Sequence, residues 1–99
     1  MNDYSGRSIL ANYFRGMEGV GGKLHFDEEG LTFVSHAFNI QTGETRIDYK
    51  QIKSVAKRNT LGIFPNGMSI FTNDGIEHKF VIYKRTVVIE FINQHIVPR

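Results

Sequence analysis

The stretch NDGIEHKFVIYKRTVVIEFINQHI, residues 73–96, changes its hydrophobic period halfway. Asn73–Gly75 is a strong short hairpin signal, and alternate residues of Ile76–Tyr83 then form one largely apolar face, as in a half-buried strand. From Arg85 to Ile96 the apolar residues follow helical spacing instead. The stretch therefore predicts a strand that leaves a hairpin and leads into an amphipathic C-terminal helix near Thr86–Ile96, with the threonine as its N-cap.

Most of the remaining chain also follows the period of two that strands show. The clearest case is residues 44–49, where Thr, Ile and Tyr alternate with charged residues. Counting Ile9–Met17 as the first, the pattern predicts six or seven short antiparallel strands, and a helical turn near Lys50–Ile52 leads into one of them. Turn signals with Gly, Asn, Asp or Pro separate the segments, and they lie at residues 27–30, 42–43, 65–67 and 73–75.

Glycine is concentrated in one short segment, at positions 16, 19, 21 and 22. Such density suits either a loop that wraps a phosphate or a sharp turn between strands. A P-loop requires Gly-Lys-Ser/Thr before a helix, whereas Gly22 and Lys23 are followed by Leu24 and a segment patterned like a strand. We therefore predict that the cluster is the loop joining the first two strands, with at least one glycine at positive φ. Gly30, in the next turn, is a further candidate for positive φ.

Composition excludes several classes of protein. The 99 residues, 40% of them hydrophobic and 22% charged, fit one globular domain spanning residues 1–99. The chain has no cysteine, so it holds neither a disulfide nor a thiolate metal site. No apolar run is long enough to span a membrane, and the N-terminus lacks a signal-peptide pattern, so we expect a cytoplasmic protein. The net charge of +2 permits contact with acidic partners without requiring it.

The residues give no pattern for catalysis or cofactor binding. The four histidines are scattered, and none has another His, Asp or Glu at the helical spacing of metal ligands. No nucleophile is paired with a base, so we expect neither an enzyme nor a metal or other cofactor. The aromatic residues fall in apolar phases and no RNA-binding aromatic motif is present, so nucleic acid is not an expected partner.

Strands followed by one closing helix are the outline of a pleckstrin-homology-like domain. The ordered segments of this chain resemble the GRAM domain, a branch of that superfold, and most closely its short, free-standing bacterial form. The resemblance covers residues 9–94 and rests on the order of the pieces rather than on one motif. These pieces are GGKLHFDEEGLTFVSH (21–36), IDYKQIKSV (47–55), TLGIFPNGMSIFTNDG (60–75), HKFVIY (78–83) and KRTVVIEFINQ (84–94). The implied fold is mainly β with one α-helix: a β-barrel of six or seven antiparallel strands closed by a C-terminal amphipathic helix.

The resemblance implies a non-enzymatic, intracellular binding module. We expect it to engage anionic membrane lipid weakly, at the inner face of the membrane, or to bind a protein partner. The alternative is a module for protein–protein interaction or homo-oligomerisation through a strand edge or the helix face, with no lipid role. For each basic side chain the competing interpretation is a solvated position on a strand face. The candidate residues for an anionic ligand are Lys53, Lys57 and Arg58, or the rim group Arg15, Lys23 and Arg46.

Overall fold

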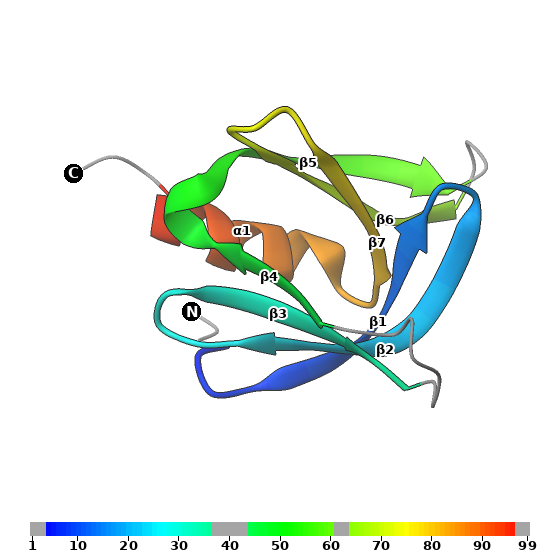
Figure 1. The fold of residues 1–99 in the computed structure, drawn as a ribbon, viewed down its shortest axis with the longest axis horizontal. Coiled ribbons are helices and arrows are strands. Elements are labelled where there is room, and N and C mark those ends of the chain that lie inside the picture. Colours follow the sequence, from blue (N-terminus) through cyan, green and yellow to red (C-terminus); the bar gives the residue numbers. More distant parts are fainter. Residues whose placement is uncertain (1–3, 37–43, 61–63, 97–99) are drawn as a thin grey trace.

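The computed structural model describes residues 4–36, 44–60 and 64–96, apart from the side chains of residues 15, 60, 64 and 65. Seven antiparallel strands form one sheet in the order β4-β3-β2-β1-β7-β6-β5 (Figure 1). A short 3₁₀ helix, η1 (Tyr49–Gln51), joins the two edge strands, and α1 (Arg85–Ile96) follows the last strand. The strands are β1 (Ser8–Arg15), β2 (Glu18–Phe26), β3 (Gly30–Ser35), β4 (Glu44–Asp48), β5 (Ile52–Thr60), β6 (Phe64–Thr72) and β7 (Glu77–Ile82).

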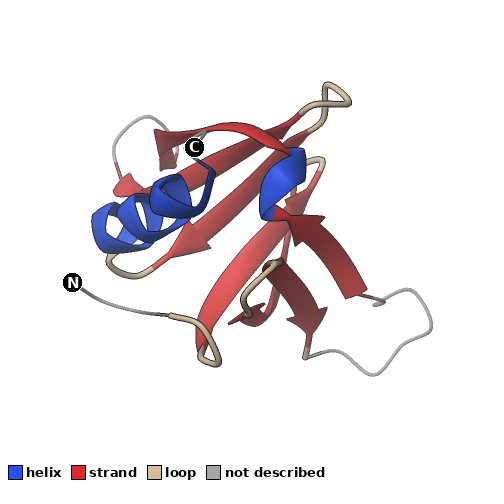
Figure 2. Ribbon diagram, turned by 90° about the vertical axis from the view of Figure 1, so that its left-hand side faces the viewer, coloured by secondary structure: helices blue, strands red, loops and turns tan. Residues whose placement is uncertain are grey.

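The sheet curls into a half-barrel, and α1 lies against one side of it (Figures 1 and 2). β1 joins the two halves, because it pairs with β2 along its whole length and with β7 from Ala11 to Phe14. The helix packs mainly against β5, one of the two edge strands. This arrangement confirms the predicted fold class, the strand number and the C-terminal helix. No helix in the described part of the chain combines the length and the apolar character needed to cross a membrane.

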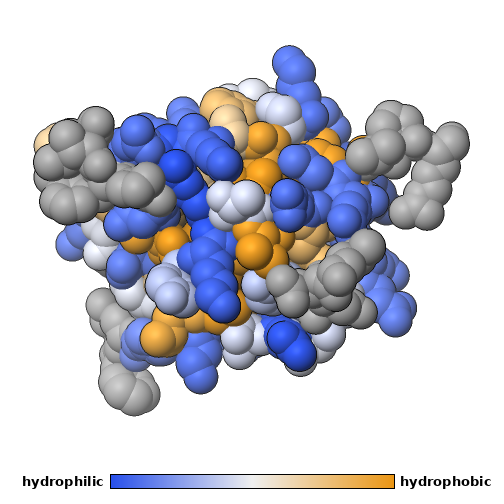
Figure 3. Space-filling view, turned by 180° about the vertical axis from the view of Figure 1, so that it is seen from behind, coloured by the Kyte–Doolittle hydropathy of each residue, from blue (hydrophilic) through white to orange (hydrophobic). Residues whose placement is uncertain are grey.

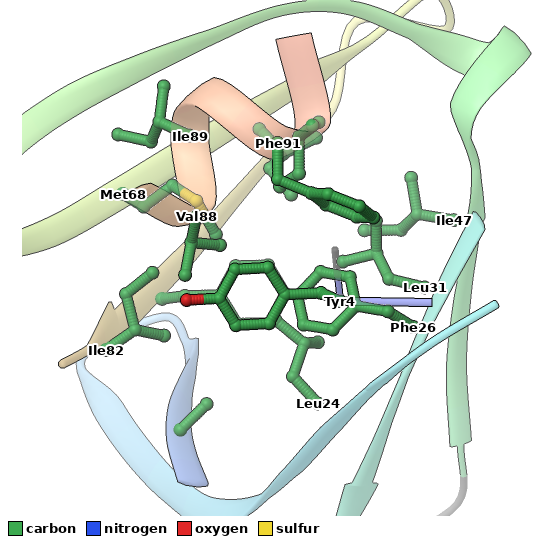
Figure 4. Close-up of a cluster of buried hydrophobic side chains, with 14 of the residues drawn as sticks. Tyr4, Leu24, Phe26, Leu31, Ile47, Met68, Ile82, Val88, Ile89 and Phe91 are labelled. Atoms are coloured by element: carbon green, nitrogen blue, oxygen red, sulfur yellow. The ribbon is translucent and has the colours of Figure 1, made fainter. Parts of the chain in front are cut away.

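The core fills the space between the curled sheet and the buried face of α1 (Figure 4). Phe91, which is 3% exposed, sits at its centre and contacts the rings of Tyr4, Phe26 and Tyr49. On the predicted apolar face of residues 76–83, Phe80 and Ile82 are buried as expected, whereas His78 is half-buried and Ile76 is 48% exposed. Tyr4 lies before the first strand, and nothing in the periodicity of the sequence marked it as a core residue.

The predicted local structure holds at two places and fails at a third. A helical turn does precede β5, and Gln51 Oε1 accepts a 3.0 Å hydrogen bond from the Asp48 N–H at its start. The Asn73–Gly75 turn is also present, with its glycine at a φ of 86°. The N-cap prediction was wrong, because α1 already begins at Arg85 and Thr86 lies inside its first turn. The residue directly before the helix is Lys84, whose φ of 57° turns the chain from β7 into α1.

The prediction that the four clustered glycines form a loop was largely wrong. β1 and β2 are joined by a turn of only two residues, Gly16 and Met17, and the other three glycines belong to β2. Gly16 has a φ of 65°, which confirms the expected positive φ. Gly22 is needed for close approach, because a Cβ there would lie 2.3 Å from the Val34 carbonyl oxygen of β3.

Two other turn signals have a different role from the one predicted. Gly30 has no positive φ: it starts β3, and a Cβ there would lie 2.3 Å from the Ile47 carbonyl oxygen of β4. Pro65–Gly67 is not a reversal but the beginning of β6, an inner strand of the sheet. An irregular register between Arg58 and Thr60 of β5 lies beside this proline. The turn predicted at residues 42–43 lies outside the described residues.

Candidate functional site

Arg46 of β4 is engaged in ion pairs within the protein. Its guanidinium binds the Asp27 carboxylate, and its Nε donates a 2.8 Å hydrogen bond to Asp48 Oδ1. The hydrogen bond from Arg46 lowers the pKa of Asp27 to about 2, and the backbone N–H groups of Glu29 and Gly30 act in the same direction. Both ion pairs found among the described residues involve this arginine. Its charge therefore stabilises the turn between β2 and β3 and is largely neutralised there.

The side chain of Arg58 in β5 packs against residues of other strands. Its guanidinium carbon stands 5.7 Å from the centre of the Phe14 ring, and its side chain covers Gly67 of β6. Its Nη1 atom is buried and has no hydrogen-bond partner in the described part of the structure. The side chain is therefore partly desolvated by packing and less available to a ligand than a lysine in solvent would be.

Lys53 and Lys57 of β5 are exposed, and so is Lys50 of η1 just before them. None of the three has an ion-pair partner among the described residues. β5 is an edge strand, and exposed lysines on such an edge also oppose pairing with another chain. Lys57 and Arg58 are adjacent in a strand, so their side chains point to opposite faces of the sheet. The three lysines are thus available as a basic edge to which Arg58 contributes little.

The rim group does not come together as one cluster. Lys23 of β2 is exposed and lies between Leu10 of β1 and Val34 of β3. Arg46 is two strands away, on β4, in a different cross-strand row. The backbone of Arg15 ends β1 next to the β1–β2 turn, and its side chain lies outside those that the structure describes.

A second group of cations, which sequence reasoning missed, surrounds a hollow of about 740 Å³ where β7 meets α1. It consists of Arg7, Lys84 and Arg85, and its apolar wall is formed by Tyr4, Ile82 and Val87. Arg85 is anchored there, since its Nη1 donates hydrogen bonds to the carbonyl oxygens of Arg58 at 2.7 Å and Gly67 at 3.3 Å. The adjacent basic pair at residues 84–85 was visible in the sequence, but the approach of residue 7 depends on the fold.

This hollow belongs to the side of the molecule that carries α1. Figure 3 looks onto that side and shows apolar surface in its middle, with strongly polar residues beside it.

The described residues do not include a group of three or more His, Asp or Glu side chains that could hold a metal ion. His78 is half-buried, and its ring forms a hydrogen bond with the hydroxyl group of Tyr13. Desolvation lowers its pKa below the usual 6.5, although the nearby Asp74 carboxylate opposes this shift. The stacking of the two rings makes this pair part of the packing between β1 and β7.

Comparison with solved structures shows which fold this is. The N-terminal PH domain of human ARAP2 superposes with a TM-score of 0.72 at 14% sequence identity, covering 96% of this chain and 84% of that domain. The C-terminal domain of an unknown protein from Leishmania infantum gives a TM-score of 0.70 at 16% identity, over 87% of this chain and 81% of that one. No family model and no curated protein sequence matches the chain. The fold is therefore that of a pleckstrin-homology-like domain.

Proposed function

We propose that this chain is a non-enzymatic binding module that engages anionic membrane lipid weakly through its basic β5 edge. The pleckstrin-homology-like fold is typically non-catalytic and commonly binds lipids or proteins. The observation that carries the proposal is the set of three exposed lysines, Lys50, Lys53 and Lys57, within eight residues of η1 and β5. The ordered motifs of residues 9–94 further support assignment to the GRAM branch of this fold, in its bacterial free-standing form. A cytoplasmic protein that visits the inner face of the membrane is the cellular setting that fits this role.

The expected affinity is low. Each basic residue close to an anionic membrane contributes about 1 kcal/mol, so three lysines contribute about 3 kcal/mol. Because these side chains are solvated, salt screens the attraction over a length of about 8 Å at physiological ionic strength. Two of the candidate cations contribute less than an exposed lysine, because Arg46 is paired with two carboxylates and Arg58 is packed against the sheet.

Flotation with vesicles of phosphatidylserine and phosphatidylcholine tests the proposal. The wild-type protein is expected to float with these vesicles at low salt and to lose most of its binding at physiological salt. It is not expected to bind vesicles of phosphatidylcholine alone. Replacing Lys50, Lys53 and Lys57 with Gln is expected to abolish binding. The matched control is Arg46→Gln, which removes a charge that is already paired. Flotation that survives the triple substitution, or none at low salt, would refute a lipid role for this edge.

A protein partner is the second candidate function, and one observation favours it. Leu10 and Tyr83 are 68% and 82% exposed, and large apolar or aromatic side chains in solvent are typical of surfaces that another protein covers. Under this alternative the lysines of β5 serve only to keep the strand edge solvated.

A further inference from the structure

Two hollows meet at the side chain of Tyr83. The first, of about 470 Å³, lies on the outer face of β1, β2 and β7, and the second is the basic hollow between β7 and α1 described above. They share Asn66, Ile82 and Tyr83 as lining residues, so they are two parts of one continuous surface. Tyr83 is highly exposed where they meet.

The first hollow is suited to an apolar side chain. Leu10 and Val81 supply apolar side chains to its lining, which also includes Gly21 and Gly22. Gly21 has no steric need to be glycine, since a Cβ there would meet Asn12 Oδ1 at 3.4 Å, an ordinary contact. The packing of the strand does not require a glycine here. The absence of a side chain at Gly21 does, however, keep the hollow open.

The second hollow is suited to negative charge. Arg7, Lys84 and Arg85 line it, and neither hollow has an Asp or Glu among its described lining residues. The Lys84 ammonium stands 5.8 Å from the centre of the Tyr83 ring, so the cations begin directly beside the exposed aromatic ring. Arg85 uses its Nη1 for backbone carbonyls and is paired with no carboxylate in the described structure.

From this juxtaposition we propose that the Tyr83 surface docks an acidic segment of a partner protein, in which an apolar side chain is followed closely by carboxylates. The apolar side chain enters the hollow over Gly21, and the carboxylates lie against Arg7 and Lys84. Charge complementarity selects the acidic partner. The two adjoining hollows favour discrete side chains over the broad surface of a bilayer. This site uses none of the lysines of the β5 edge, so it goes beyond the proposed lipid-binding role.

Selection from a phage-displayed library of random peptides, followed by fluorescence anisotropy on the enriched sequences, tests this proposal. We expect the library to be enriched for peptides with an apolar residue next to Asp or Glu. Tyr83→Ala is expected to weaken binding at least tenfold. The double substitution of Arg7 and Lys84 by Gln is expected to weaken it at least fivefold and to reduce its dependence on salt.

A second variant fills the proposed site without removing any contact. Gly21→Leu places a side chain in the apolar hollow and is expected to weaken binding at least tenfold, while its thermal midpoint reports whether the fold is kept. Should that variant not fold, the exposed Tyr83→Ala still decides the outcome. The matched control is Lys57→Gln, which is expected to leave peptide binding unchanged.

Three outcomes would overturn the proposal: no peptide is enriched, the enriched peptides lack acidic residues, or Tyr83→Ala binds them as tightly as the wild type does. Flotation of vesicles that depends on Arg7 and Lys84, in place of peptide binding, would show that this surface serves lipid. Loss of vesicle binding in the Lys50, Lys53 and Lys57 variant tests the proposed function separately, because those residues lie outside the Tyr83 surface.

Discussion

The hydroxyl oxygen of Tyr13 lies 2.8 Å from Nδ1 of His78 and so links β1 to β7. The Tyr13 ring also packs against Phe33 and Phe80, with ring centres 5.4 Å and 4.9 Å apart. In a neutral imidazole Nδ1 can accept a hydrogen bond from the hydroxyl group, whereas in a protonated imidazole both ring nitrogens are donors. The pair therefore ties the protonation state of one half-buried histidine to the packing between two strands.

Stability is expected to fall as the pH drops below about 6.5. Burial lowers the pKa of His78 in the folded protein, while the unfolded chain titrates near the usual 6.5. The unfolded state therefore binds more protons in this window, so the stabilisation is complete above 6.5 and is lost as the pH falls through the lowered pKa. Urea unfolding at pH 7.5, 6.5 and 5.5 measures this pH dependence of the free energy of unfolding. His78→Gln should flatten the profile, and the exposed His25→Gln should not; identical profiles for all three proteins would contradict this account.

Phe91→Ala is expected to destabilise the protein by about 3–5 kcal/mol, because it removes a buried ring at the centre of the core and leaves a cavity. Chemical denaturation of both proteins gives the difference. Tyr83→Ala, which shortens an exposed side chain, serves as the control and should change the free energy of unfolding by less than about 0.5 kcal/mol. A loss below about 1 kcal/mol for Phe91→Ala would mean that α1 does not pack against the core as described.

Gly30→Ala is expected to cost about 1–3 kcal/mol, since its Cβ would collide with backbone atoms and push β3 and β4 apart. The colliding atoms are the Ile47 carbonyl oxygen at 2.3 Å and the Asp48 Cα at 2.7 Å. Gly21→Ala is the matched control, because its Cβ meets only ordinary contacts. Thermal unfolding of the two variants compares them directly, and equal midpoints would show that β4 does not approach β3 so closely.

Arg58→Met is expected to leave stability unchanged or to raise it by up to about 1 kcal/mol. The thioether side chain keeps the packing over Gly67 and Phe14 but removes a buried donor that lacks a partner. An unsatisfied buried polar group costs about 1–3 kcal/mol, which exceeds the roughly 0.5–1 kcal/mol of an exposed cation–π contact. Arg58→Ala, which also loses the packing, should be less stable than Arg58→Met in urea unfolding. A loss above about 1 kcal/mol for Arg58→Met would show that the charge itself stabilises the sheet.

Local patterns sufficed for the elements of this fold because their causes are local. The alternation in residues 44–49 and 76–83 and the helical spacing after Arg85 each depend on neighbours within one or two turns or pleats. The same holds for the turn of 3₁₀ helix before β5. The glycine cluster was harder to predict, since three of its members are explained by contacts with other strands or by an open hollow rather than by a turn.

The candidate site was less predictable, because the state of a cation depends on residues distant in sequence. Arg46 and Asp27 are 19 residues apart in sequence. Arg58 meets Phe14 although two strands, β7 and β6, lie between their own strands in the sheet. Periodicity assigns such residues to a polar face but not to a partner.

The amino-acid sequence alone thus determined the strands, the closing helix and most of the buried face, through hydrophobic period and turn chemistry. Which positive charges remain available depends on the tertiary structure, because strand order and register set the neighbours of each side chain. In the folded protein Arg46 forms ion pairs with two carboxylates and Arg58 packs against the sheet, whereas the lysines of the β5 edge stay in solvent. The tertiary structure also brought Arg7 to the same hollow as Lys84 and Arg85, since antiparallel pairing of β1 with β7 places the start of β1 next to the end of β7.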